Sequence, residues 1–107
     1  MALQVAAVSF QMIEVLRPLV PRIRARDKSL ADQLVRAASS VVLNIGEAER
    51  SDPGNRRARF FTAAGSASET QYAVNLAVKW GYVATPEGDE ALALLDRINA
   101  MLWKLTH

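Results

Sequence analysis

The feature that most constrains the fold is a stripe of apolar residues between positions 30 and 48. Its members recur at steps of three or four residues: Leu30, Leu34, Ala37, Val41, Ile45 and Ala48. These steps match the 3.6-residue turn of an α-helix and place the side chains on one helical face. We therefore predict an amphipathic helix here, with Ser29 as its N-cap and Asp32 in its first turn.

The preceding segment, residues 3–25, carries the same helical pattern. Its apolar positions are Val5, Val8, Met12, Ile13, Leu16, Leu19, Val20 and Ile23. Pro18 and Pro21 lie inside this pattern. A proline in a helix interior removes a backbone donor and clashes with the preceding turn, so we expect a kink or a break at these positions.

Two further helices are predicted after the strongest turn signal in the chain, residues 51–55. Asp52 before Pro53 is the arrangement of an N-cap followed by a proline in the first helical position. The helix that starts there is expected to end at Gly81, which suits the left-handed conformation found at helix C-termini. Thr85, again before a proline, is the predicted cap of the last helix.

The predicted fold class is all-α, an antiparallel up-and-down four-helix bundle in one domain, residues 1–107. No segment alternates apolar and polar residues as a strand does, and the short connections favour antiparallel neighbours. The length of 107 residues suits a single domain, and a hydrophobic content of 50% suits a packed core. The apolar faces are wider than one small bundle can bury, which predicts self-association.

The composition argues against most catalytic chemistry. The chain has no cysteine, and His107 is its only histidine. A thiolate nucleophile, a histidine-based triad and a histidine zinc site are therefore not expected. The carboxylates Glu47, Glu49 and Glu69 lack the internal histidines that metal sites in bundles use. We expect no enzyme activity, no cofactor and no metal.

No apolar run reaches the length of a membrane span, and the first residues lack the pattern of a signal peptide. We therefore expect a cytoplasmic protein with no membrane partner.

Positive charge is concentrated in the first half of the chain. Residues 1–59 carry ten lysines and arginines against six acidic residues, whereas residues 60–107 carry three against five. Two basic clusters stand out: Arg22, Arg24, Arg26 and Lys28 in the first, and Arg50, Arg56, Arg57 and Arg59 in the second. All eight are candidate nucleic-acid-binding residues, and the alternative for both clusters is a solvated charged face.

The second cluster is the more informative, because its arginines lie in the first turns of a predicted helix. There the helix dipole disfavours cations by about 0.3–1 kcal/mol each. Phosphate contact would use these arginines together with the free backbone N–H groups of the helix start. We interpret the neighbouring Phe60 and Phe61 as core and interface residues in preference to base-stacking platforms.

A polar stripe accompanies the apolar one on the helix that spans positions 30–48. It consists of Arg36, Ser40, Asn44 and Glu47, and we expect it to face the next helix, where Glu69 is a candidate partner. The small residues at positions 63–68, with Gly65 in mid-helix, predict a close helix–helix contact that offsets the helical cost of glycine.

Three stretches of the chain carry recognisable motifs. Residues 34–48 read LVRAASSVVLNIGEA, residues 60–69 read FFTAAGSASE and residues 79–83 read KWGYV. In that order they resemble the R-R-A-A-x-S-I-x-x-N-I-A-E-G, F-x-x-x-A-x-G-S-x-x-E and L-G-Y-L motifs of the four-helix bundle proteins first noticed as reading frames in 23S rRNA intervening sequences. The matching motif residues are Arg36, Asn44, Glu47, Gly65, Ser66 and Glu69, which we interpret as structural or subunit-interface residues.

The resemblance implies an antiparallel bundle that assembles as a homopentameric barrel and has no enzyme activity. Relatives in diversity-generating retroelements act as accessory subunits of a reverse transcriptase and bind nucleic acid through basic surfaces. We therefore expect a non-enzymatic homo-oligomer that binds nucleic acid, with RNA favoured over DNA, or a nucleoprotein partner such as a reverse transcriptase, through basic surface residues. The alternative is a protein–protein interaction scaffold that binds no nucleic acid.

Overall fold

The computed structural model describes residues 2–107, with side chains over residues 4–107, and this part of the chain is all-helical without a strand. Its helices are α1 (Ala2–Leu16), α2 (Leu19–Arg26), α3 (Lys28–Glu49), α4 (Pro53–Lys79) and α5 (Thr85–Thr106). The predicted all-α class is confirmed. The structure has five helices where the sequence predicted four.

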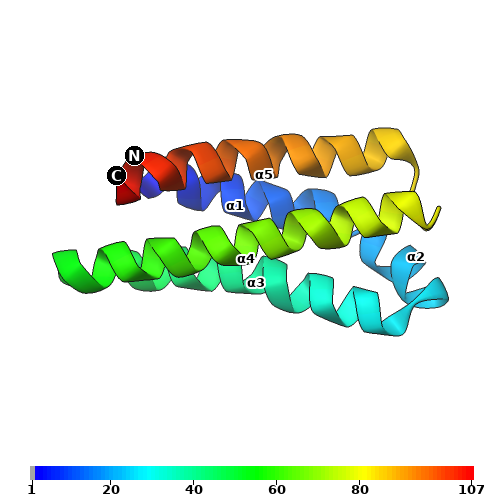
Figure 1. The fold of residues 1–107 in the computed structure, drawn as a ribbon, viewed down its shortest axis with the longest axis horizontal. Coiled ribbons are helices and arrows are strands. Elements are labelled where there is room, and N and C mark those ends of the chain that lie inside the picture. Colours follow the sequence, from blue (N-terminus) through cyan, green and yellow to red (C-terminus); the bar gives the residue numbers. More distant parts are fainter. Residues whose placement is uncertain (1) are drawn as a thin grey trace.

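The fifth helix arises from the break at Pro18. Residues 3–25, predicted as one helix, form α1 and α2, which are separated by Arg17 and Pro18. The backbone N–H of Arg17 still donates to the Ile13 carbonyl at 2.8 Å, but Pro18 has no N–H with which to continue the ladder. Pro21 lies in the first turn of α2, where a missing N–H costs little. The chain therefore changes direction at Pro18, and α2 packs beside α3 (Figure 1).

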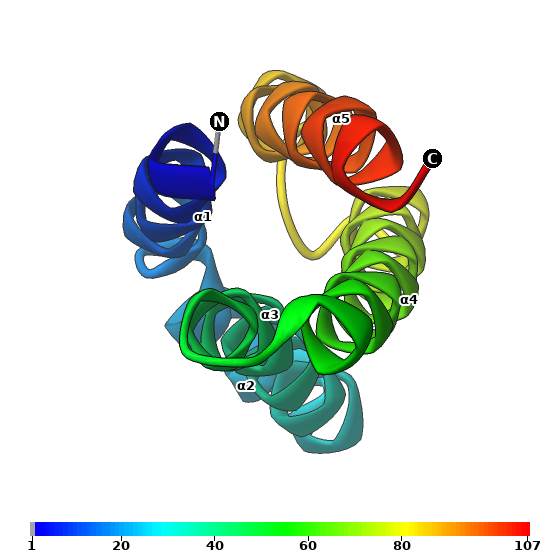
Figure 2. The same cartoon turned by 90° about the vertical axis from the view of Figure 1, so that its left-hand side faces the viewer.

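The four longer helices run along the long axis of the molecule, whose extents are 42 × 22 × 19 Å. Viewed end-on, they follow the order α1, α5, α4, α3 around that axis (Figure 2). The short turns that join α3 to α4 and α4 to α5 make each pair antiparallel. As a result, the start of α4 and the end of α5 lie at the same end of the molecule (Figure 1).

The core fills the space between these helices. All members of the apolar stripe predicted on α3 are buried, and Val41 and Ala48 are fully enclosed. Phe60 of α4 is 1% exposed, so the prediction of a core position holds for this residue. Among the described side chains, every buried nitrogen or oxygen atom has a hydrogen-bond partner. The described interior therefore contains no unpaired polar atom that would indicate a buried binding site, and we look for candidate sites on the surface.

Two of the predicted helix starts are shifted. Asp27 caps α3, since its carboxylate accepts the Leu30 N–H at 2.9 Å, and the predicted cap Ser29 lies inside the first turn. Thr85 is the first residue of α5, and Ala84 is the residue before it with extended backbone. The start of α4 after Asp52 and the left-handed Gly81 beyond its end, with a φ of 78°, are as predicted.

The small residues of α4 serve two different surfaces. Ala63 and Ala67 are buried against the neighbouring helices, but Gly65 is exposed, and a Cβ atom built there would meet nothing within 4 Å. The prediction that Gly65 permits a close contact is therefore wrong within one chain. The tight approach lies instead at Gly88 of α5, where a Cβ atom would overlap the Cγ2 methyl of Val78.

Gly88→Ala is expected to lower the free energy of unfolding by about 1–3 kcal/mol, the usual range for overpacking. Val78 cannot easily move aside, because a β-branched side chain in a helix has one strongly preferred rotamer. Denaturant unfolding monitored by circular dichroism measures the change. Gly46→Ala is the matched control, because a Cβ atom at Gly46 meets nothing within 4 Å and alanine favours the helix. Equal stabilisation by both changes would contradict the close α4–α5 contact.

Candidate nucleic-acid interface

The two basic clusters lie at opposite ends of the molecule. Arg22, Arg24, Arg26 and Lys28 belong to α2 and the start of α3, whereas Arg50, Arg56, Arg57 and Arg59 surround the α3–α4 turn. Because α3 runs the length of the bundle, the two clusters are separated along its long axis (Figure 1). One chain therefore does not gather the eight candidate residues into one surface.

The cluster on α2 is largely neutralised by carboxylates. Arg22 forms a two-point ion pair with Glu87 of α5, with N–O distances of 3.0 and 2.5 Å. Asp32 accepts hydrogen bonds from Arg24 at 2.5 Å and from Lys28 at 2.8 Å. The hydrogen bonds from Lys28 and Arg24 lower the pKa of Asp32, and the hydrogen bond from Arg22 lowers that of Glu87. These pairs leave little positive charge available for an anionic ligand.

Arg26 is the member of this cluster that makes no ion pair with any described residue. Its guanidinium carbon lies 5.5 Å from the ring centroid of Tyr82, a cation–π arrangement. This contact joins the end of α2 to the α4–α5 turn.

The cluster at the α3–α4 turn is the less neutralised of the two. Arg59 pairs with Glu47 at 3.3 Å, and both side chains are about half exposed. Arg50, Arg56 and Arg57 make no ion pair within residues 4–107, and all three are exposed. Three adjacent uncompensated cations therefore mark this end of the molecule as the stronger candidate for anion binding.

Two of these arginines are held in place by backbone carbonyl groups. The Nε atom of Arg56 donates to the Ala48 carbonyl at 3.3 Å, and that of Arg57 donates to the Thr106 carbonyl at 2.9 Å. Both bonds use Nε and leave the terminal Nη groups for a ligand. The carbonyl contacts therefore orient both guanidinium groups. The planar fork of each group matches the oxygen geometry of a phosphate.

The start of α4 is not a free anion site. The Asp52 carboxylate accepts the Asn55 N–H at 3.1 Å and the Asn55 side-chain amide at 2.8 Å. These hydrogen bonds lower the pKa of Asp52. The expectation that phosphate would use free backbone N–H groups of this helix start is therefore wrong, because a carboxylate of the chain already occupies the position. Phosphate contact would rest on the arginine side chains.

The polar stripe of α3 does face α4. Arg36 pairs with Glu69 at 3.2 Å, and the hydroxyl groups of Ser40 and Ser66 lie 2.7 Å apart. The Asn44 amide donates to the Ser40 carbonyl at 2.9 Å, within α3. Among the motif residues, Arg36, Glu69 and Ser66 thus connect two helices of one chain, whereas Asn44 bonds within α3. A role for any motif residue between subunits stays a prediction.

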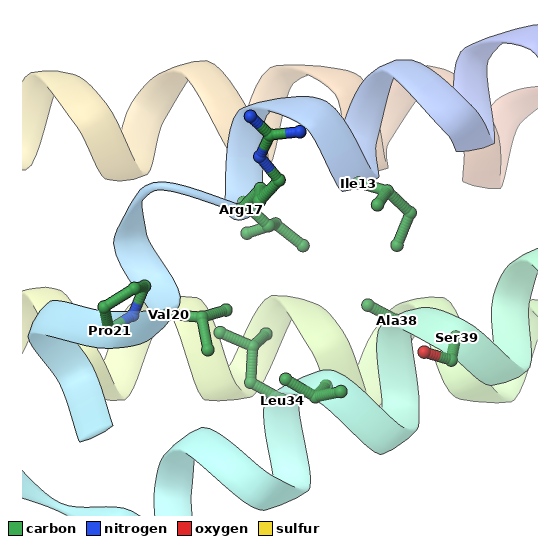
Figure 3. Close-up of a pocket in the computed structure, with 9 residues that line it drawn as sticks. Ile13, Arg17, Val20, Pro21, Leu34, Ala38 and Ser39 are labelled. Carbon is green, nitrogen blue, oxygen red and sulfur yellow. The ribbon is translucent and has the colours of Figure 1, made fainter.

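Apolar side chains reach the surface in three other regions. A hollow of about 270 Å³ lies beside the helix break. It is lined by Ile13, Val20 and Leu34, and the Arg17 guanidinium extends away from it (Figure 3). A larger hollow of about 650 Å³ further along α1 and α3 includes the exposed side chains of Phe10 and Leu43. On α4 and at its C-cap, the side chains of Tyr72, Leu76 and Trp80 follow one another at four-residue steps and are 76%, 47% and 66% exposed.

Other kinds of site are not found in the described part of the chain. No group of three or more histidine, cysteine, aspartate or glutamate side chains there could hold a metal ion. None of the five helices is long and apolar enough to cross a membrane.

Comparison with known proteins places this geometry in a family context. The family model described as 23S rRNA-intervening sequence protein matches residues 2–104. A crystal structure of a protein of unknown function from the S23 ribosomal protein family of Bacteroides thetaiotaomicron is similar, with a TM-score of 0.88 and 21% sequence identity. The similarity covers 95% of this chain and 97% of that one, and at this identity it shows a shared fold. No curated protein matches the sequence.

Asp52 is expected to make the stability of the first turn of α4 depend on pH. Its pKa is lowered in the folded protein, so the stabilisation is complete above the pKa of an unfolded aspartate and is lost as the pH falls through the lowered value. Asp52→Asn keeps a capping oxygen but removes the titrating group. The difference in Tm between wild type and variant is therefore expected to shrink between about pH 5 and pH 2. A difference that stays constant over this range would contradict the assignment.

Proposed function

The chain belongs to the 23S rRNA-intervening sequence protein family, and from this premise we propose that it is a non-enzymatic homo-oligomer that binds RNA through Arg50, Arg56 and Arg57. The observation that carries the proposal is the absence of any ion pair to these three arginines among the described residues. The cluster on α2 differs in this respect, since Arg22, Arg24 and Lys28 all pair with carboxylates.

The positions of the three arginines support phosphate binding. All are exposed, two are oriented by backbone carbonyls, and they surround one helix–helix turn. Contacts between such side chains and phosphates release counterions from the nucleic acid, which supplies affinity without reading the base sequence. This kind of site suits an RNA held by its backbone, and the same chemistry extends to DNA.

Self-association would strengthen a weak single site. Three cations on one chain give modest affinity, whereas several copies presented together act on one RNA as a multivalent surface. The net charge of +2 per chain also multiplies with the number of copies. We propose a homopentamer, the assembly that the family resemblance implies for a four-helix bundle of this type.

Surface features that one chain leaves unexplained support this assembly. Tyr72, Leu76 and Trp80 form an exposed apolar ridge on α4, and Phe10 and Leu43 border the hollow along α1 and α3. A contact between two different surfaces of identical chains is heterologous and closes into a ring when the rotation allows. Gly65, exposed on α4 and costly to the helix, fits a close approach by a neighbouring copy.

We further propose that the bound RNA belongs to a nucleoprotein, such as the complex of a reverse transcriptase, as the resemblance to accessory proteins of diversity-generating retroelements implies. We place this complex in the cytoplasm, a reducing compartment that a chain without cysteine permits.

The second candidate function is a protein–protein scaffold, which the exposed apolar ridge and the hollow along α1 and α3 favour. The two functions differ in whether the arginines at the α3–α4 turn are needed.

Replacing Arg50, Arg56 and Arg57 together by glutamine is expected to weaken RNA binding and to flatten its salt dependence. Loss of three phosphate contacts lowers the slope of log K against log salt by about 2 to 3. Fluorescence anisotropy of a structured RNA and a matched DNA duplex, each at several salt concentrations, measures both effects.

The matched control removes three exposed cations elsewhere, with Arg17, Lys79 and Arg97 changed to glutamine. It is expected to bind RNA nearly as the wild type does. Wild-type binding by the first variant would refute the proposed site, and an equal loss in both variants would show that only net charge matters. No binding by the unmodified protein, even at low salt, would favour the scaffold.

Leu76→Glu is expected to reduce the mass of the assembly from five times the 11.7 kDa of one chain towards the mass of a single chain. The change places a charge on the apolar ridge, where burial by a neighbouring copy would desolvate it. Multi-angle light scattering measures the mass, and circular dichroism verifies that the helices persist. Gln33→Glu adds the same charge at an exposed polar position of α3 and should leave the mass unchanged. An unmodified protein with the mass of one chain would refute the homo-oligomer.

A further inference from the structure

A cluster of aromatic rings lies beside the arginines at the same end of the molecule. The imidazole of His107 stacks on the indole of Trp103, with ring centroids 3.4 Å apart and an angle of 18° between the planes. Phe61 of α4 meets the same imidazole edge to face at 5.7 Å. Side chains from α4 and from the end of α5 therefore form one aromatic surface.

Arg57 joins this aromatic cluster to the proposed phosphate site. Its guanidinium carbon lies 5.2 Å from the centroid of the Phe61 ring, while its Nε atom donates to the Thr106 carbonyl. The same side chain thus contacts an aromatic ring of α4 and the backbone of α5. A cation and an aromatic ring therefore meet on this surface.

Packing of the core does not explain why Phe61 and Trp103 are exposed. Phe60 is 1% exposed and fills the interior, whereas the adjacent Phe61 is 45% exposed and Trp103 is 61% exposed. We predicted that both phenylalanines belong to the core or to an interface. Phe60 lies in the core, and an interface position for Phe61 stays a prediction. Exposed aromatic rings next to oriented arginines are the combination that proteins use to bind unpaired nucleotides.

We propose that an unpaired nucleobase of the bound RNA stacks on the Trp103 cluster while Arg56 and Arg57 contact the adjoining phosphates. The inference rests on the proposed RNA binding and adds the class of RNA, a single-stranded or looped segment. A base within a duplex is already stacked on both faces, so only a splayed base can lie on a side-chain ring. The His107 imidazole already lies parallel to the indole, which is the geometry that a stacked base would adopt on this cluster.

The test compares Trp103→Leu with Trp103→Phe in the full chain. The probe is a fluorescein-labelled oligouridylate of about 12 nucleotides, and an RNA duplex of the same length serves as the second ligand. Leucine keeps an apolar side chain without a ring, and Trp103→Leu is expected to weaken single-strand binding about 5- to 150-fold, the range measured for loss of one stacked base. Phenylalanine keeps a ring and should restore most of the affinity.

Tryptophan fluorescence gives an independent readout that does not depend on the folding of the leucine variant. In Trp80→Phe the remaining indole is Trp103, and in Trp103→Phe it is Trp80, which lies at the other end of α4. Unlabelled oligouridylate is expected to quench the first protein and to leave the second unchanged.

The outcomes separate this inference from the proposed function. If Trp103→Leu binds the oligouridylate as tightly as the wild type and Trp103 is not quenched, the stacking site is refuted. Loss of binding on changing Arg50, Arg56 and Arg57 would in that case leave RNA binding through phosphates intact. Equal affinity of the wild type for duplex and single strand would also refute the stacking site. Absence of all RNA binding would refute both.

Discussion

The contact between α3 and α4 is the interaction on which the rest of the structure depends. Three side-chain pairs cross it: Arg36 with Glu69, Ser40 with Ser66, and Glu47 with Arg59. From the first pair to the third, the α3 residue advances from 36 to 47 while the α4 residue goes back from 69 to 59. The three pairs therefore share one antiparallel register. Apolar packing between two helices tolerates sliding, whereas displaced polar pairs lose their partners. The register also determines where the α3–α4 turn and its arginines lie.

Local patterns predicted most of the helices because each depends on neighbours a few residues away. The spacing of the apolar stripe, the cap at Asp52 and the left-handed Gly81 are properties of short segments, and all three are present. The helix count differed because proline inside a pattern permits either a bend or a complete break, and packing of α2 against α3 decides between them. The close contact predicted at Gly65 is absent within one chain, because a small residue indicates a close contact without indicating its partner.

The candidate site was less predictable, since charge compensation depends on residues far apart in the sequence. Arg22 is neutralised by Glu87, 65 positions away, and Arg57 is tied to Thr106, 49 positions away. The sequence favoured the cluster of Arg57 over that of Arg22 only through the helix dipole, and neither contact was predicted. Trp103 was not singled out as a site residue, because nothing in the local pattern of α5 separates an exposed indole from a buried one. The similar crystal structure shares 21% of its residues over nearly the whole chain. A fold kept at such low identity leaves its surface free to differ, and function resides in that surface.

The break at Pro18 separates a short helix, α2, from the four long helices, and the two parts differ in how easily they unfold locally. α2 has eight residues, and isolated helices shorter than about 12–15 residues are marginal in water. Its buried side chains are those of Leu19 and Ile23, a small share of the interior. Its other contacts lie at the surface: the ion pairs of Arg22 and Arg24 and the packing of Arg26 on the Tyr82 ring. Local opening free energies follow the amount of buried apolar contact, so we expect α2 to be the least protected unit of the bundle in amide hydrogen exchange. The hollow beside it, with Ile13 on one side of the break and Val20 on the other, changes shape whenever that unit opens.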